Sequence, residues 1–480
     1  MIEIFQIIFR VIVFIELGVF LHEFEVLLVK QYYQVKRFSK VVYNHYKYLI
    51  FILLFLDLLS IFLVDSIYYY LYHILSLSLL IVLFKYDHFS FSRRVVFQEV
   101  ACVFILSIIW WVPHVLAFKI IFSYLSIILS FYLLLPLENR IKKHYINKAR
   151  RKIDKLKGMK IIGITGSFGK TSMRHYLVSV LKIKYKVETP PNNFNTLMGI
   201  AKFINNSLKP CSFLVLELGV DQRNQMKKFK EIFTLDYAII TSIGNMHLAT
   251  FKNIDNLIKE KLSIKNLLKE DGKLFLNKDD RYLSSLDLQE AIYFSKDNLF
   301  FDNYDIEGIS LKYNNKSYLF NVHQRFFITY LDGIIKLSSL ENISERDIYY
   351  SCKLFSDFSR RNSISKLPRG YLIDNSYNAN YEGIKESLYL LSLLEGEKYI
   401  LTSGIIEQGK NFNKENERLK DLFEGYRVIF IGSKKHPLVI NHHFKELIIT
   451  KSLREAYKLI RDINPDNLLL LSKGDNIFLR

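Results

Sequence analysis

The fold of this chain is decided by the stretch Ile161-Ile-Gly-Ile-Thr-Gly-Ser-Phe-Gly-Lys-Thr-Ser172. An apolar run with β character, Met159–Ile164, leads into a loop punctuated by glycines, and an amphipathic segment follows from Met173. This order predicts a strand, a loop and a helix. The N–H groups of such a loop and the positive end of the helix dipole attract an anion, so the stretch predicts a phosphate-binding loop.

Three residue types in the loop carry the phosphate chemistry. Gly166 and Gly169 let the backbone turn so that its N–H groups point inward. Lys170 supplies a point charge for the β- and γ-phosphates, and Thr171 or Ser172 offers a hydroxyl to Mg²⁺. The strict phosphate-loop pattern has glycine where this chain has Ile164, five positions before Gly169, so a chance glycine-rich turn is the alternative.

Composition bounds the class of protein. A chain of 480 residues is long enough for two or three domains. Half of the residues are hydrophobic, and the excess lies before Pro136. The net charge of +19 fits either a nucleic-acid binder or a membrane protein with basic cytoplasmic loops. The three cysteines form neither a set of pairs nor a metal-ligand spacing, which predicts free thiols in a reducing compartment. They are Cys102, Cys211 and Cys352.

The N-terminal part of the chain is predicted to be a membrane domain. Five apolar stretches approach the length that crosses a bilayer core of about 30 Å. They are Ile4–Leu21, Tyr48–Val64, Ile67–Phe84, Val100–Phe118 and Ile120–Leu135. The distribution of lysine and arginine predicts that the remainder is cytoplasmic, in a multi-pass protein of the inner membrane. The basic run Arg140–Lys157 favours anionic lipid headgroups as its partner over nucleic acid.

From Met159 onward strands and helices alternate, which predicts parallel α/β sheets of nucleotide-binding type. The predicted fold is thus an α-helical transmembrane segment followed by two α/β domains, a central ATPase domain with the phosphate loop and a Rossmann-like C-terminal domain. The expected boundaries are a membrane domain 1–140, a basic linker 141–157, a central domain 158–357 and a C-terminal domain 358–480.

Three further residues are candidates for the same site. Glu217 ends an apolar strand at the edge where α/β sheets bind ligands, and its carboxylate is placed to hold Mg²⁺; an acid facing water is the alternative. His247 follows another such strand as a metal or phosphate contact, or as a structural histidine. Lys261 falls inside the apolar stripe of a helix predicted at Asn253–Lys269, so it either snorkels to solvent or is paired or modified.

In their order and spacing these motifs resemble the Mur ligase family, from the phosphate loop through Lys261. The matching stretches are Gly166-Ser-Phe-Gly-Lys-Thr171, Thr189-Pro-Pro-Asn-Asn-Phe-Asn195, Glu217-Leu-Gly219, Ile243-Gly-Asn-Met-His-Leu248, Asp374-Asn-Ser-Tyr-Asn-Ala-Asn380 and Lys473-Gly-Asp475. The last two resemble the family member that adds D-alanyl-D-alanine to a UDP-N-acetylmuramoyl tripeptide. The resemblance implies membership in peptidoglycan precursor synthesis, with ATP and Mg²⁺ as cofactors.

The resemblance also implies roles for single residues. Lys261 would carry a carbamate and reach a second Mg²⁺, which makes Lys170, His247 and Lys261 the catalytic set. The implied metal ligands are Thr171, Glu217, His247 and the Lys261 carbamate. ATP would be bound by Thr165, Gly166, Ser167, Phe168, Gly169, Lys170, Thr171, Ser172, Arg361, Asp374 and Asn375. Substrate would be bound by Asn193, Asn195, Tyr377, Asn378 and Lys473.

The chain also departs from the family. The acid that contacts the ATP ribose is replaced by Asn375, and the His-Asn pair near the adenine reads His323-Gln324. The usual UDP-binding domain is replaced by the apolar N-terminal part, so no site for uridine is visible.

The expected reaction is acyl activation in two steps: a carboxylate attacks the γ-phosphate of ATP, and an amine then attacks the acyl phosphate. Three alternatives stay open. They are another membrane-bound ligase of this type, such as a poly-γ-glutamate synthetase, a membrane NTPase, and a scaffold for other cell-wall enzymes.

Overall fold

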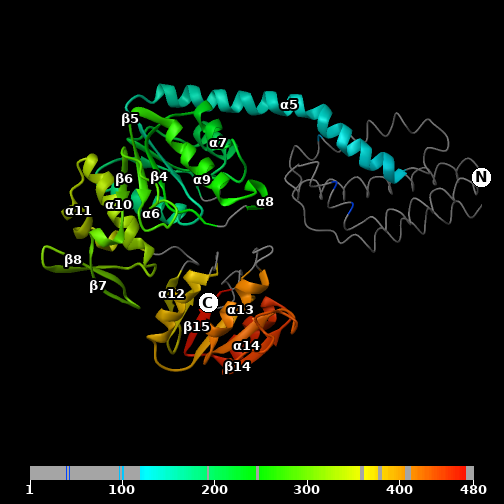
Figure 1. The fold of residues 1–480 in the computed structure, drawn as a ribbon, viewed down its shortest axis with the longest axis vertical. Coiled ribbons are helices and arrows are strands. Elements are labelled where there is room, and N and C mark those ends of the chain that lie inside the picture. Colours follow the sequence, from blue (N-terminus) through cyan, green and yellow to red (C-terminus); the bar gives the residue numbers. More distant parts are fainter. Residues whose placement is uncertain are drawn as a thin grey trace, which may run out of the picture. The chain divides into compact units, whose positions relative to one another are not determined.

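The computed structural model describes residues 119–191, 194–244, 248–356, 362–376, 381–405 and 412–471, together with the isolated helical positions 39, 43, 97, 100 and 101. The chain divides into two compact units, Met1–His144 and Tyr145–Arg480. Figure 1 shows the elements of the second unit, which carries both large sheets.

The predicted transmembrane segment is wrong for the residues that the structure describes, since none of their helices combines the length and the apolar character needed to cross a bilayer. The fifth predicted span, Ile120–Leu135, is the start of α5 (Lys119–Lys155), a helix of 37 residues. Its apolar stretch is interrupted by Pro136 and Glu138 after about 24 Å, at 1.5 Å per residue, which is short of a core of about 30 Å. The first four predicted spans lie outside the described residues, apart from the isolated positions, and the multi-pass membrane localisation is not retained.

The first sheet contains six parallel strands in the order β2-β3-β1-β4-β5-β6. Successive β1 residues alternate between two cores: Ile162 and Ile164 pack with α6 and α10 on one face, and Ile161 packs with α7 and α9 on the other. The elements are β1 (Lys160–Thr165), α6 (Lys170–Leu181), β2 (Val187–Glu188), α7 (Leu197–Asn206), β3 (Phe213–Glu217), η2 (Met226–Glu231), β4 (Leu235–Ile240), α8 (Leu248–Phe251), α9 (Ile254–Leu262), η3 (Ser263–Leu267), β5 (Leu268–Asn277), β6 (Ala291–Phe294), η4 (Lys296–Asn298) and α10 (Phe326–Leu340).

A small antiparallel sheet and two short helices complete this part of the chain. The sheet has the order β7-β8-β9, and it was not predicted from the sequence. The aromatic rings of Tyr313 and Tyr349 stack at 4.5 Å and fasten it to α11. The elements are β7 (Phe300–Asp305), β8 (Gly308–Tyr313), β9 (Lys316–Phe320), α11 (Glu345–Tyr350) and η5 (Cys352–Leu354).

The second sheet has the order β10-β11-β15-β12-β13-β14 and is parallel except for the pairing of β10 with β11. Buried residues of α12 and α13 pack on one face, and buried residues of α14 pack on the other. The elements are β10 (Ser363–Lys366), β11 (Tyr371–Asp374), α12 (Tyr381–Ser392), β12 (Lys398–Thr402), α13 (Phe412–Phe423), β13 (Arg427–Ile431), β14 (Glu446–Thr450), α14 (Leu453–Ile463) and β15 (Asn467–Leu470). The two predicted α/β sheets are thereby confirmed.

The predicted helix at Asn253–Lys269 is shorter in the structure. Asn253 caps it, because its side chain accepts a hydrogen bond from Asn256 N, and α9 ends at Leu262. A 3-10 turn follows, and Leu268 already begins β5. Because α9 ends at Leu262, Lys261 lies in the last turn of this helix, on the side that faces the phosphate loop.

Candidate functional site

The phosphate loop joins β1 to α6 and is held by the end of the neighbouring strand β4. Ser167 N donates to Ser242 O at 2.8 Å, and Phe168 N donates to Ser242 Oγ at 2.9 Å. Thr241 Oγ1 donates to Phe168 O. These bonds fix the loop between the carboxyl ends of two parallel strands, the place where α/β sheets bind nucleotides.

Gly169 is required at its position for two reasons. Its φ of 77° lies in the left-handed region, and a Cβ built there would stand 1.7 Å from Tyr330 Oη. Tyr330 is a buried residue of α10, so the helix behind the loop leaves room for a backbone but not for a side chain.

The Lys170 side chain folds back over its own loop. Its Nζ donates to Gly166 O at 2.7 Å and to Ser167 O at 3.3 Å. The ammonium therefore already lies against the loop that the sequence predicts to cradle phosphates.

Glu217 is the last residue of β3, and it is buried beside the start of α6. Thr171 Oγ1 donates to Glu217 Oε2 at 3.1 Å, so the two predicted Mg²⁺ ligands are in contact. Glu217 Oε1 accepts no hydrogen bond and lies 3.0 Å from Arg174 Nε in an ion pair. A carboxylate 93% buried does not face bulk water, so the solvent-facing alternative is excluded.

Lys261 points into the same site. Only 3% of the residue is exposed, and its Nζ donates to Gly166 O at 2.9 Å. Burial, with a smaller contribution from the charge of Lys170, lowers the pKa of the Lys261 amine to about 7. The side chain does not snorkel to solvent, and near neutral pH a large share of it is the neutral, nucleophilic amine.

These groups suit a hard cation. Mg²⁺ prefers oxygen ligands, and the Thr171 hydroxyl, the Glu217 carboxylate and a carbamate on Lys261 are all of that kind. The described part of the chain contains no group of three histidine, cysteine or acidic residues placed to hold a metal. A metal at this site would have the Thr171 hydroxyl and the Glu217 carboxylate as ligands, and His247 lies outside the described residues.

Three residues at positions that the resemblance assigns to the nucleotide, Asp374, Asn375 and His323, make hydrogen bonds within the protein. Asn375 Nδ2 donates to Gly383 O and to Ser387 Oγ, at 3.1 and 2.9 Å, and so joins β11 to α12. Asp374 Oδ1 accepts a hydrogen bond from Ser376 N at 3.0 Å, within its own turn. The His323 ring is buried and its Nε2 donates to Ile306 O at 2.8 Å. Hydrogen bonds within the protein thus engage all three side chains.

The remaining predicted residues divide into two groups. Asn195 lies beside the strand end that carries Glu217, because Gly219 N donates to Asn195 O at 2.8 Å. The others lie outside the described residues: Asn193, Arg361, Tyr377, Asn378 and Lys473.

Sequence reasoning missed three residues of the site. Thr241 and Ser242 could be found only through the pairing of β1 with β4, which joins positions about 75 residues apart. Arg174 had a local signal, because it stands three residues after Thr171 and therefore on the same face of α6.

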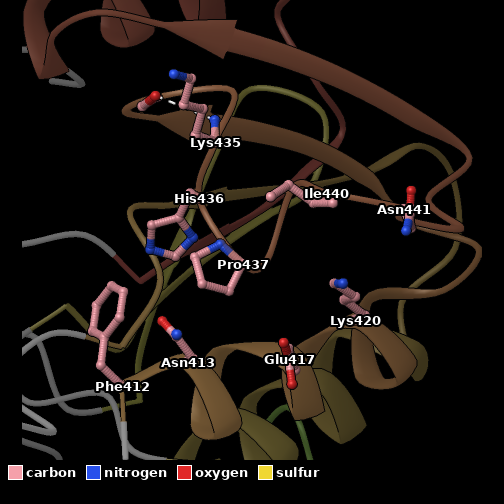
Figure 2. A pocket seen from close by; sticks show the side chains of 10 residues that line it. Phe412, Asn413, Glu417, Lys420, Lys435, His436, Pro437, Ile440 and Asn441 are labelled. Atoms are coloured by element: carbon pink, nitrogen blue, oxygen red, sulfur yellow. Dashed lines mark hydrogen bonds between the residues drawn. The ribbon is translucent and has the colours of Figure 1, made fainter. Parts of the chain in front are cut away.

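A separate cavity of about 580 Å³ lies in the second sheet region, between the first turns of α13 and the loop after β13 (Figure 2). Two lysines and one glutamate give its lining a net positive charge. Burial lowers the pKa of His436, whose Nδ1 accepts a hydrogen bond from Leu438 N. The lining residues are Phe412, Asn413, Glu417, Lys420, Ser433, Lys435, His436, Pro437, Ile440 and Asn441.

Comparison with known proteins agrees with this geometry. Residues 164–332 match the Mur ligase middle domain. The chain is 25% identical over 274 residues to the UDP-N-acetylmuramoyl-tripeptide–D-alanyl-D-alanine ligase of Bacillus subtilis, covering 54% of this chain and 59% of that protein. It is 26% identical over 314 residues to the ligase of the same name from Buchnera aphidicola, covering 59% and 66%. The chain thus spans about 60% of the length of these relatives.

Solved structures show the same fold. MurF from Acinetobacter baumannii superposes with a TM-score of 0.60 at 18% identity, covering 70% of this chain and 78% of that one. MurF from Thermotoga maritima, solved in complex with ADP, gives 0.60 at 19% identity, covering 69% and 80%. The described α/β sheets therefore have a MurF-like fold, and residues 164–332 are similar to the Mur ligase middle domain.

Proposed function

We propose that this protein is an ATP-dependent, ADP-forming ligase that joins D-alanyl-D-alanine to the free carboxylate of a UDP-N-acetylmuramoyl tripeptide in peptidoglycan precursor synthesis. One observation carries the proposal: Lys170, Thr171, Glu217 and Lys261 converge on one phosphate loop, inside the segment that matches the Mur ligase middle domain. The curated relatives named for this reaction support the choice of substrates.

The first step transfers the γ-phosphoryl group to the acid. A carboxylate oxygen attacks the γ-phosphorus, the bond to ADP breaks, and an acyl phosphate forms. Lys170, held against Gly166 O, is within reach of the charge that develops on the transferring group. Thr171 and Glu217 would hold Mg²⁺, which supplies further charge neutralisation when bound.

The second step makes the amide bond. The amine of the dipeptide attacks the acyl carbon, inorganic phosphate leaves, and the amine loses a proton. The cavity in Figure 2 is where we place the carboxylate end of the dipeptide, because its lining includes Lys420 and Lys435 and only one acid, Glu417.

We further propose that Lys261 carries a carbamate. Its neutral amine would attack CO₂, an N–C bond would form and one proton would leave to solvent, so that a buried neutral amine becomes an anion next to the phosphate loop. The low pKa and the burial of Lys261 support this modification. The other residue roles implied by the resemblance stay proposals. His247 is proposed as a metal contact, and Arg361 and Asp374 as ATP contacts. The proposed substrate contacts are Asn193, Asn195, Tyr377, Asn378 and Lys473.

The test is a phosphate-release assay on the purified full-length protein. With ATP, Mg²⁺, UDP-muramoyl tripeptide and D-alanyl-D-alanine we expect phosphate and the pentapeptide product, and phosphate only when both acceptors are present. Lys170→Met should abolish both signals while leaving the fold intact. Phosphate release with neither acceptor would favour the NTPase alternative, and amide formation with glutamate in place of the dipeptide would favour the poly-γ-glutamate type of ligase.

A further inference from the structure

Arg174 occupies an unusual place for a cation, because it is only 7% exposed and follows the phosphate loop by one turn of α6. Its Nε lies 3.0 Å from Glu217 Oε1. On the other side of the guanidinium, Nη1 donates to Pro190 O at 2.6 Å and reaches Thr189 Oγ1 at 3.5 Å. One planar group therefore contacts both a predicted metal ligand and the segment that follows β2.

The segment that follows β2 makes two further hydrogen bonds, one to β3 and one to the residues just after Glu217. Thr189 Oγ1 donates to Val215 O of β3 at 2.8 Å, and Asn195 O accepts from Gly219 N at 2.8 Å. The described residues of this segment, 189–191 and 194–195, thus begin beside Arg174 and end beside the residues that follow Glu217.

We propose that Arg174 is a positioning residue that couples the metal site to the described parts of this segment, residues 189–191 and 194–195. Its planar guanidinium holds the Glu217 carboxylate so that Oε2 faces Thr171, and it holds Pro190 O at the same time. With Mg²⁺ and ADP bound at the phosphate loop, Arg174 would protect these residues from exchange, and removal of the guanidinium would separate the two sites. The proposal rests on the proposed function only in taking this segment as a wall of the acid-substrate site.

Hydrogen–deuterium exchange on the full-length protein tests the coupling without ligase turnover. In the wild type, addition of MgCl₂ and ADP should slow amide exchange both in peptides covering 166–172 and in peptides covering 189–199. In Arg174→Met the first response should remain and the second should be lost. If MgCl₂ and ADP still slow amide exchange in peptides covering 189–199 of Arg174→Met, the proposal is overturned.

Arg174→Lys distinguishes positioning from mere stability, since it keeps a buried cation beside Glu217 but loses the planar guanidinium. We expect the melting temperature of Arg174→Lys to be closer to that of the wild type than the melting temperature of Arg174→Met is. The slowing of amide exchange in 189–199 on addition of MgCl₂ and ADP should still be absent. Full recovery of that response in Arg174→Lys would show that the guanidinium is not needed and would also overturn the proposal. Arg427→Lys is the matched control, because Arg427 pairs with Glu397 and Glu446 in the second sheet, and it should change neither response.

Kinetics add a second readout if the ligase activity is found. Arg174→Lys should raise the KM for UDP-muramoyl tripeptide about 10-fold, as expected for one lost charge-assisted hydrogen bond, and the KM for ATP less than about 3-fold. Equal increases in both KM values would contradict a role in coupling. Failure of ligase turnover would leave the exchange experiment intact, so the two proposals fail separately.

Discussion

Glu217 and Asp374 occupy comparable places in the two sheets, and the structure treats them differently. Each is the last residue of a parallel strand and is buried. Glu217 contacts Thr171 and Arg174 of another element, and its Oε1 accepts no hydrogen bond. Asp374 accepts a hydrogen bond from the backbone two residues on. The same position in a sheet thus gives an acid prepared for a ligand in one case and an acid that shapes its own turn in the other.

The electrostatic surroundings of the two acids differ in the same sense. Lys170 and Lys261 both donate to Gly166 O, and Arg174 pairs with Glu217. Burial, with a smaller contribution from the charge of Lys170, lowers the pKa of Lys261. Lys170 and Arg174 thus put positive charge at this loop, where a nucleoside triphosphate would bring several negative charges. We therefore expect substitution of Glu217 to act on the reaction, and substitution of Asp374 to act on stability.

The largest effect should come from paired substitutions at these two acids. Glu217→Gln removes the negative charge that we propose holds Mg²⁺ and that forms the ion pair with Arg174, so we expect kcat to fall about 10²–10³-fold. Asp374→Asn keeps an oxygen that accepts from Ser376 N, so we expect kcat within about 5-fold of the wild type. Steady-state kinetics at saturating ATP measure both. Equal losses in the two variants would remove the distinction between the acids.

A somewhat smaller effect is expected at Lys261. Lys261→Ala removes the amine that we propose is carbamoylated, and kcat should fall about 10²-fold and recover in part with added formate or acetate. Lys259→Ala is the matched control, because Lys259 is in the same helix but is exposed, and it should behave as the wild type. An active Lys261→Ala variant that ignores added carboxylates would show that Lys261 has only a structural role.

The pH dependence of stability gives an independent measure of Lys261 in the unmodified protein. Its pKa is about 7 in the folded state, against an ordinary value of 10.5 for a lysine in the unfolded chain, so the unfolded state binds more protons between pH 7 and pH 10.5. Stability should therefore rise with pH in this window, and this part of the rise should be absent in Lys261→Met. Chemical denaturation at pH 7 and pH 9 tests the difference.

The sequence predicts most of the first site because its signals are local. The strand, glycines and helix of residues 159–172 follow one another directly, and the stripe of α9 identifies Lys261 as a residue that is buried with apolar neighbours. Ser242 and Thr241 were missed because their role depends on the pairing of β1 with β4, which no local pattern encodes.

Hydropathy and family position were weaker guides than local motifs. The stretch Ile120–Leu135 is apolar enough to suggest a span, but α5 continues into a basic segment and is not a membrane-crossing helix. At Asn375 the family position predicts a ribose contact, whereas the hydrogen bonds of its side chain depend on Ser387, a residue of another element that the motif does not include.

The smallest effect on the reaction is expected at Asn375. Asn375→Asp restores the family's acid, but it replaces an amide that donates to Gly383 O and Ser387 Oγ with a carboxylate that cannot donate to the Gly383 carbonyl. We expect the free energy of unfolding to fall by about 1–3 kcal/mol, because a buried carboxylate replaces an amide donor that faces the Gly383 carbonyl. The KM for ATP should change less than about 3-fold, since the position supports the joint between β11 and α12. Denaturant titration measures the effect on stability, and steady-state kinetics with varied ATP measure the effect on nucleotide binding. A clear drop in the KM for ATP at unchanged stability would show that position 375 contacts the nucleotide. The end of β11 would then take part in the reaction, as the end of β3 is proposed to do.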